Sequence, residues 1–133
     1  MSRWLERPGH VTENPGDLPG GFKAAGVACG LKPSGGMDLG LMVCSAHECV
    51  SAARFTRSGV LAAPVVLTKE RSRLDALRVI VANSGNANAA TGRRGFEDAA
   101  RMQGAAAMAG GVSETKVAVA STGVIGVPLP ADP

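Results

Sequence analysis

Apolar and polar residues alternate most regularly between residues 37 and 44. The odd-numbered positions are Met, Leu, Leu and Val, whereas the even-numbered positions begin with Asp38 and end with Cys44. This period of two predicts a β-strand with one apolar face, and it places Asp38 on the opposite, solvated face. The polar residues 45–48 predict a turn, after which residues 49–56 are expected to return as the antiparallel partner of a hairpin.

Other apolar segments predict further strands. Small apolar residues cover 22–29, a β-branched run stands within 77–82, and another apolar run covers 116–120. The β-branched run is expected to form a central strand. Residues 62–68 are also apolar, and Pro64 within them belongs at the start or the edge of a strand.

One clear helix is expected over residues 96–109, which are rich in Ala and Met. Glu97 and Asp98 would lie in its first turn, where negative charge suits the helix dipole. The glycine pair that follows would end the helix. The charged residues 69–75 predict a solvated connection or a short helix.

The domain organisation is simple. Residues 1–20 contain prolines and glycines and predict an irregular leader. Residues 21–133 are expected to form one domain of the α/β (α+β) class. Several strands and a single clear helix are too few to cover both faces of a sheet, so we expect this domain to be incomplete.

The composition is that of a folded chain, because 45% of the residues are hydrophobic and 19% are charged. The net charge is +3, but acidic residues stand close to most of the basic ones. Without a basic stripe or aromatic platforms, nucleic-acid binding is not expected. The first residues lack an apolar signal-peptide core, and no apolar run is long enough to cross a membrane. We therefore expect a cytoplasmic protein.

The three cysteines are Cys29, Cys44 and Cys49. Cys44 and Cys49 flank His47, but a zinc site needs four ligands at closer, paired spacings. Free thiols and no metal are expected, which agrees with a reducing compartment.

The tripeptide Ser121-Thr122-Gly123 follows the last predicted strand and is the first candidate for chemistry. A Thr hydroxyl and a glycine N–H that converge on one point are the donors that a tetrahedral oxyanion needs. The same residues could simply cap a helix, with Thr122 satisfying backbone donors. Taken alone, the tripeptide favours the helix cap.

Residues 83–92 form the second candidate, because carboxamides and glycines after a buried strand could cradle an anion such as a phosphate. The alternative is a network of Asx turns that ties down an irregular loop, and this alternative is favoured. His10 and His47 lie in irregular segments and do not support a Ser-His-Asp triad.

A series of short motifs follows residue 20 in a fixed order. They are Gly21-Phe22-Lys23-Ala24-Ala25-Gly26-Val27, Asp38-Leu39-Gly40-Leu41, Phe55-Thr56, Ala62-Ala63-Pro64-Val65, Asn83-Ser84-Gly85-Asn86-Ala87-Asn88-Ala89, Thr91-Gly92 and Ser121-Thr122-Gly123-Val124-Ile125-Gly126-Val127-Pro128-Leu129-Pro130. In order and spacing, the chain resembles the N-terminal part of the α chain in the ornithine acetyltransferase family. The resemblance covers residues 21–133.

The resemblance implies an αββα-type sandwich, here incomplete, and an acetyltransferase of arginine biosynthesis. Family members move acetyl from N-acetylornithine to glutamate, and some also use acetyl-CoA. The precursor cuts itself before a threonine into α and β chains, and that threonine, activated by its own amine, is the nucleophile. The chains assemble as an α₂β₂ heterotetramer without a metal or a cofactor.

The resemblance also assigns the site. It places the oxyanion hole at the Thr122 hydroxyl and the Gly123 N–H, which reverses the preference for a helix cap. The nucleophile and the later substrate-binding residues would lie beyond Pro133, so the chain is expected to be inactive alone.

Two positions depart from the family pattern, because Ala90 stands where Cys is usual and Arg54 where Gly is usual. Two other functions are left open by the sequence. One is a related self-cleaving aminopeptidase or amidase. The other is a non-catalytic module that binds a phosphate ligand through residues 83–92.

Overall fold

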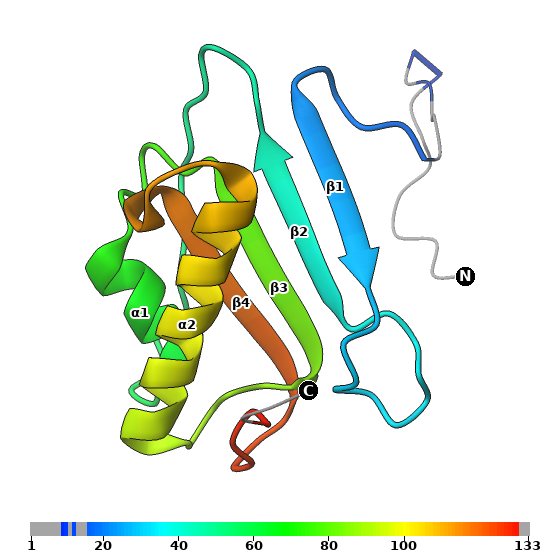
Figure 1. Ribbon diagram of the computed structural model, residues 1–133. Coiled ribbons are helices and arrows are strands. Elements are labelled where there is room, and N and C mark those ends of the chain that lie inside the picture. The colour runs from blue at the N-terminus through cyan, green and yellow to red at the C-terminus, as the bar shows by residue number, and fades with distance from the viewer. Residues whose placement is uncertain (1–8, 11, 13–15, 131–133) are drawn as a thin grey trace.

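The computed structural model describes residues 9, 10, 12 and 16–130, which excludes most of the predicted leader. The described residues contain a four-stranded sheet in the order β1-β2-β3-β4 (Figure 1). The strands are β1 (Phe22–Val27), β2 (Leu39–Cys44), β3 (Val79–Asn86) and β4 (Val117–Val124). The first two pairs are antiparallel and the last pair is parallel. A parallel pair needs a long crossover, which contains helix α2 (Gly92–Gly110).

Helices α1 (Ala63–Arg71) and α2 lie side by side on one face of the sheet (Figure 1). Beneath them, alternate residues of β3 and β4 form the core. The buried apolar side chains are Leu67, Val79, Val81, Ala99, Ala106, Ala107, Val117 and Val119. Because the α2 residues in this set are alanines, the helix packs close to the strands.

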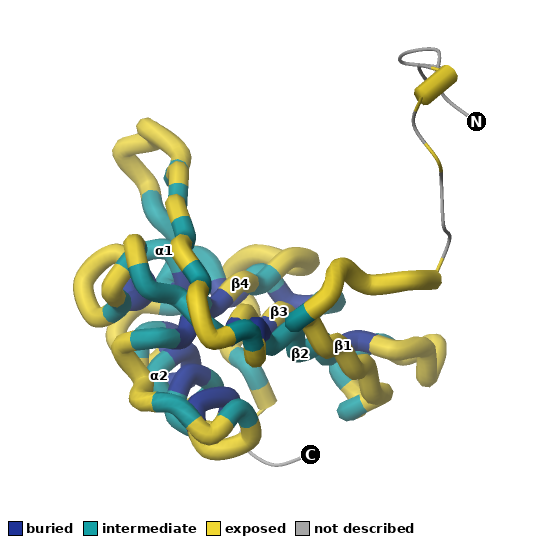
Figure 2. Tube along the Cα trace, turned by 90° about the horizontal axis from the view of Figure 1, so that it is seen from above, coloured by how far each residue is buried: buried dark blue, intermediate teal, exposed yellow. Residues whose placement is uncertain are grey.

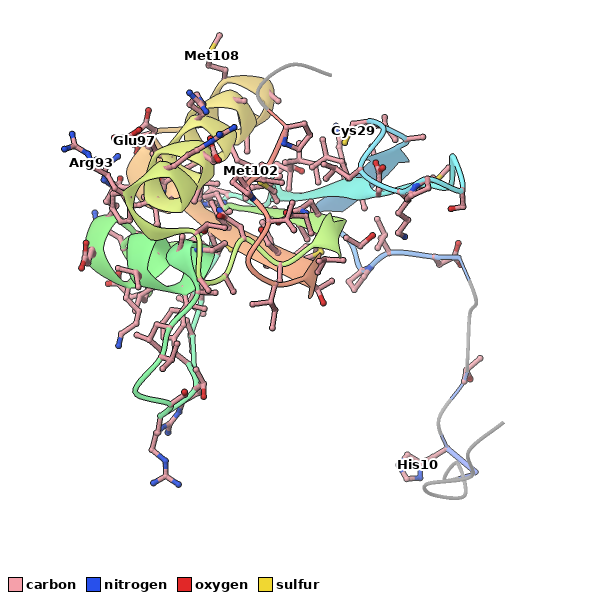
Figure 3. All side chains as sticks on the ribbon, turned by 90° about the horizontal axis from the view of Figure 1, so that it is seen from below. His10, Cys29, Arg93, Glu97, Met102 and Met108 are labelled. Carbon is pink, nitrogen blue, oxygen red and sulfur yellow. The ribbon has the colours of Figure 1, made fainter. Side chains whose placement is uncertain are left out.

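The helices contact β3 and β4, whereas β1 is exposed along its length (Figure 2). An apolar groove of about 580 Å³ runs between α2 and β2, lined by Leu41 and Met102 among others. On the outer side of α2, Arg93 pairs with Glu97 at 2.9 Å (Figure 3).

The four-stranded sheet with two helices on one face confirms the predicted mixed α+β class. The described residues supply one helix layer and one sheet layer of the expected sandwich.

The predicted hairpin is wrong, because residues 49–56 form no strand. Both edges of β2 are taken by β1 and β3. The segment is instead tied to the connection before β3 through Ser51. The Ser51 hydroxyl donates to the Leu74 carbonyl at 2.8 Å and accepts from the Leu77 N–H at 2.7 Å. The Ser51 N–H also donates to the Asp75 carbonyl at 3.2 Å, so this connection satisfies a backbone donor of the segment.

Residues 63–68 belong to helix α1, with Ala62 as its N-cap, and not to a strand as expected. Pro64 lies in the first turn of α1, where its missing N–H leaves no hydrogen bond unmade. Leu67 is fully buried, and the Thr68 hydroxyl accepts from the Val119 N–H at 3.0 Å and donates to its carbonyl at 3.3 Å. The hydroxyl thereby satisfies both polar groups of Val119. The short helix expected within 69–75 is the last turn of α1.

Helix α2 begins at Gly92, several residues earlier than predicted. Glu97 and Asp98 therefore lie beyond its first turn, and the expected interaction with the helix dipole is wrong. Asp98 is buried and pairs with Arg101 instead. The predicted end is confirmed, because Gly111 terminates the helix in the left-handed conformation with φ 65°.

Candidate functional site

Thr122 lies on the face of the sheet that the helices leave open. Val117 and Val119 of β4 are buried beneath the helices, so residues of the other parity, including Thr122, point to the opposite face. Thr122 is exposed and stands beside Ser84 in the register of β3 and β4. It lines an open depression of about 320 Å³ together with residues of β2 and β3. Space for a reacting group therefore exists beside its hydroxyl.

Gly123 occupies a backbone conformation that only glycine adopts easily, with φ 136°. A Cβ atom at this position would lie 2.6 Å from the carbonyl oxygen of Gly85. Gly85 itself has φ 105°. The register of the two strands shifts directly after this pair, where Asn86 faces both Thr122 and Val124. The strand pair is thus distorted at the Ser-Thr-Gly motif, and both glycines are needed for it.

The carboxamides at the end of β3 and just after it hold the chain on both sides of this distortion. Asn83 donates to the Asn86 carbonyl at 2.8 Å. Asn86 donates to the Val127 carbonyl at 2.9 Å and accepts from the Asn88 N–H at 2.7 Å. Asn88 donates to the carbonyl of Gly95 at 2.7 Å. The amides therefore tie down an irregular loop as predicted, although only Asn86 makes an Asx turn.

The same network argues against the phosphate-binding module. The three asparagine side chains are buried, and Asn88 has no exposed surface at all. Their side-chain amides bond to the protein's own backbone, and the backbone N–H groups of Ala87 and Asn88 are also paired within the protein. These donors are not available to a ligand in this arrangement. His10 and His47 are exposed, and neither lines the depression beside Thr122.

Asp38 is not solvated as its position in the strand pattern predicted. It is 3% exposed and lines the depression near Thr122. Its carboxylate accepts the backbone N–H groups of Cys29, Leu31 and Lys32 at 2.7, 2.6 and 3.0 Å. These hydrogen bonds, the Cys29 N–H first among them, hold the pKa of the carboxyl well below its usual range. The preceding loop folds back over the side chain, which no local periodicity could reveal.

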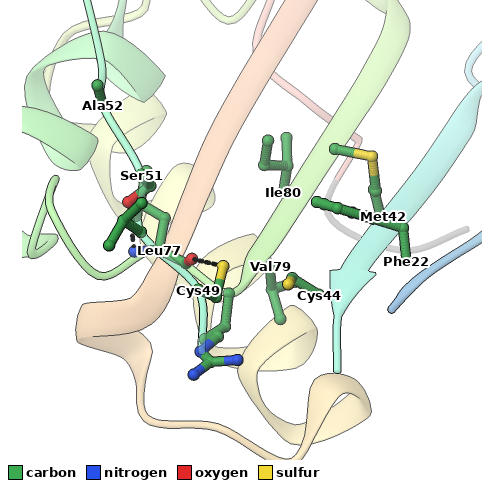
Figure 4. Close-up of a pocket in the computed structure, with 11 residues that line it drawn as sticks. Phe22, Met42, Cys44, Cys49, Ser51, Ala52, Leu77, Val79 and Ile80 are labelled. Atoms are coloured by element: carbon green, nitrogen blue, oxygen red, sulfur yellow. Dashed lines mark hydrogen bonds between the residues drawn. The ribbon is translucent and has the colours of Figure 1, made fainter. Parts of the chain in front are cut away.

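All three cysteines are free thiols, as expected. Cys44 and Cys49 line a separate cavity of about 140 Å³ on the open face of the sheet (Figure 4). Interaction with the Cys49 thiol, helped by the Ala46 N–H and the Arg78 guanidinium, lowers the pKa of Cys44. Within the part of the chain that the structure describes, no group of three or more His, Cys, Asp or Glu side chains could hold a metal ion. No helix of that part is long and apolar enough to cross a membrane.

The comparison with known proteins places this chain in a family. The family model described as ArgJ matches residues 23–133, which include the whole sheet except for Phe22. This chain belongs to the ArgJ family. The resemblance read from the motifs is therefore confirmed.

Curated relatives carry the name "Arginine biosynthesis bifunctional protein ArgJ". The one from Symbiobacterium thermophilum is 49% identical over 116 residues, which cover 86% of this chain and 29% of the relative. The one from Mycobacterium bovis is 46% identical over 119 residues, covering 86% of this chain and 30% of the relative. The chain thus spans less than a third of the length of these ArgJ proteins.

Solved ArgJ structures share the fold. An arginine biosynthesis bifunctional protein from Bacillus halodurans superimposes with a TM-score of 0.76 at 42% identity, covering 84% of this chain and 58% of that one. The ornithine acetyltransferase of Mycobacterium tuberculosis, solved in complex with ornithine, gives a TM-score of 0.77 at 44% identity. That match covers 84% of this chain and 61% of the other.

Proposed function

We propose that this chain supplies the oxyanion hole of an acetyltransferase that moves acetyl from N-acetylornithine to glutamate in arginine biosynthesis. The Thr122 hydroxyl and the Gly123 N–H are the two donors. The observation that carries the proposal is the open depression beside Thr122, at the row where β3 and β4 are distorted. Membership of the ArgJ family and the ornithine-bound relative support the substrate class.

The proposed chemistry needs donors that are in place before the reaction begins. Attack on the acetyl carbonyl places negative charge on its oxygen, and preorganised hydrogen-bond donors stabilise that charge in the transition state. Removing one such donor from an acyl-transfer enzyme typically slows turnover about 10²- to 10³-fold. The backbone of Gly85 fills the space where a Cβ atom of Gly123 would lie, so the close packing of the two strands holds the backbone of the second donor in place.

The nucleophile in this proposal is the N-terminal threonine of the β chain, which self-cleavage of the precursor exposes. Its amine removes the hydroxyl proton as the oxygen attacks the acetyl group, and ornithine leaves. Glutamate then takes the acetyl group from the threonine. Acetyl-CoA is a second acetyl donor in some family members. We place the enzyme in the cytoplasm as an α₂β₂ assembly that needs no cofactor.

The test uses the Thr122→Ala variant in the full-length enzyme. Acetyl transfer from N-acetylornithine to glutamate should fall by about 10²- to 10³-fold while the far-UV spectrum and the melting temperature change little. Thr115→Ala is the matched control, since Thr115 is exposed and precedes the opposite end of β4. Unchanged turnover in Thr122→Ala would remove the assignment. Release of free acetate without transfer by the wild type would favour the related amidase.

A further inference from the structure

We propose that Asp38 is a positioning residue for the oxyanion hole, because it holds the loop 29–32 against Gly85 and thereby fixes Gly85 against Gly123. The inference rests on the proposed function of Thr122 and Gly123. It adds to that function a residue that touches neither the substrate nor the reacting atoms.

The first step is the bond between the Asp38 carboxylate and the loop. Both carboxylate oxygens are used, since Oδ1 accepts the Cys29 N–H while Oδ2 accepts the N–H groups of Leu31 and Lys32. Hydrogen bonds to a charged acceptor are about twice as strong as neutral ones. If the loop moved away, the charged Asp38 carboxylate would lose all three of these hydrogen bonds, and the loss would cost free energy.

The second step is the contact of the loop with β3. A Cβ atom at Gly85 would lie 3.1 Å from the Leu31 carbonyl oxygen and 3.3 Å from Cγ of Lys32. A Cβ atom at Gly123 would in turn lie 2.6 Å from the Gly85 oxygen. The backbones of Leu31, Gly85 and Gly123 are thus stacked without intervening side chains. A displacement of the loop passes directly to the distorted end of β4, which carries the proposed donors.

The main chain of Asp38 acts on the same part of the sheet. Its carbonyl accepts the Ser84 N–H at 2.8 Å, and its N–H donates to the Val27 carbonyl at 3.0 Å. Ser84 is the register partner of Thr122. Asp38, Ser84 and Thr122 also line the same depression. One residue therefore fixes the strand neighbours of both proposed donors.

Because of this placement, we expect the loss of the Asp38 carboxylate to lower the rate of catalysis as well as the stability of the protein. Catalytic groups must be held within about 0.5 Å of the productive geometry, and a misplacement of about 1 Å can cost about 100-fold in rate. Asp98 offers the contrast, because it is also buried and paired, yet it lies on α2 and does not line the depression. Replacing either carboxylate should lower the stability of the protein, but only the replacement of Asp38 should move the proposed oxyanion-hole donors.

The experiment compares Asp38→Asn with Asp98→Asn in the full-length enzyme, assayed well below both melting temperatures. Asp38→Asn should lower kcat by about 10- to 100-fold and leave KM for N-acetylornithine within about twofold. Asp98→Asn should lower the melting temperature and leave kcat within about twofold. Equal kcat losses in the two variants, or an unchanged kcat in Asp38→Asn, would overturn the inference.

A double-variant cycle tests whether Asp38 acts through the oxyanion hole. In a Thr122→Ala background, Asp38→Asn should lower kcat much less than it does in the wild type. Full additivity of the two effects would contradict a positioning role. If Asp38→Asn does not fold, Asp38→Glu takes its place, since it keeps the negative charge while its longer side chain displaces the carboxylate from the loop N–H groups. A wild-type enzyme that transfers no acetyl would instead refute the proposed function itself.

Discussion

Gly123 lies against Gly85 so closely that no side chain fits between the two strands at this row. Their parallel register holds up to this pair and shifts immediately after it. Both residues have positive φ, which an L side chain rarely tolerates. The contact therefore determines where β3 and β4 stop being regular, and this is where Thr122 meets the open depression.

Replacing Gly123 by alanine should destabilise the protein strongly. The strained φ costs about 1–3 kcal/mol, and the new methyl group clashes with the Gly85 backbone. We expect a loss of about 2–4 kcal/mol in the free energy of unfolding, measured by urea denaturation. Gly59→Ala is the control, because Gly59 is exposed and nothing lies within 4 Å of a Cβ there. Similar urea midpoints for Gly123→Ala and Gly59→Ala would show that β3 and β4 accommodate the methyl group with no loss of stability.

The free energy of unfolding should depend on pH through the ionisation of Asp38. Since the folded state holds the pKa of this carboxyl well below its usual range, near 3.9, folding favours the ionised form. The stabilisation is fully present above the unfolded pKa and is lost as the pH falls below about 4 towards the folded pKa.

The measurement is a series of urea midpoints between about pH 6 and pH 2.5. The wild type should lose more stability across this interval than Asp38→Asn, which has no carboxyl to protonate. The same Asp98→Asn variant controls for the general effect of losing a buried carboxylate. Parallel pH curves for the wild type and Asp38→Asn would argue that the loop does not select the ionised form.

Cys44 should react with iodoacetamide at lower pH than Cys29 or Cys49. Its pKa is lowered by Cys49, the Ala46 N–H and Arg78, whereas the pKa values of the other two thiols are raised, Cys29 chiefly by burial and Cys49 chiefly by Cys44. The thiolate is the reactive form, so the rate follows its fraction. Mass spectrometry of alkylated peptides over a pH series measures each site separately.

Cleavage after Glu48 separates Cys44 from Cys49 and makes that assignment unambiguous. Exchanging Arg78 for glutamine should move the Cys44 profile to higher pH, because a neighbouring positive charge favours the thiolate. The Cys29 profile should stay in place as an internal reference. If Cys44 reacted last at every pH, its limited exposure would outweigh its ionisation.

Thr68→Val should destabilise the protein by about 1–3 kcal/mol, because it removes a buried hydrogen-bonding hydroxyl and keeps the shape of the side chain. The hydroxyl bonds both the N–H and the carbonyl of Val119 in β4. Thr115→Val, at an exposed position, should change the free energy of unfolding by less than about 0.5 kcal/mol. Equal thermal midpoints for Thr68→Val and the wild type would mean that Val119 finds other partners.

Features that depend only on neighbouring residues could be predicted from the amino-acid sequence alone. The alternation over 37–44 placed β2, and the β-branched run within 77–82 placed β3 at an interior position of the sheet. Gly111 ended α2 as predicted, since the left-handed cap is a local requirement. The order of motifs determined the family, with Thr122 and Gly123 among them.

Which segments come into contact depends on the packing of the whole domain and could not be predicted from local patterns. Residues 49–56 lost their place beside β2 because β3, distant in sequence, occupies that edge. Residues 62–68 are too short for their apolar pattern to separate a helix from a strand, and packing against β4 decided for the helix. Asp38 became buried because a loop returned to its carboxylate, and Gly85 touched Gly123 because two strands came together. Such contacts depend on how loops and strands fold back on one another, about which period and propensity carry no information.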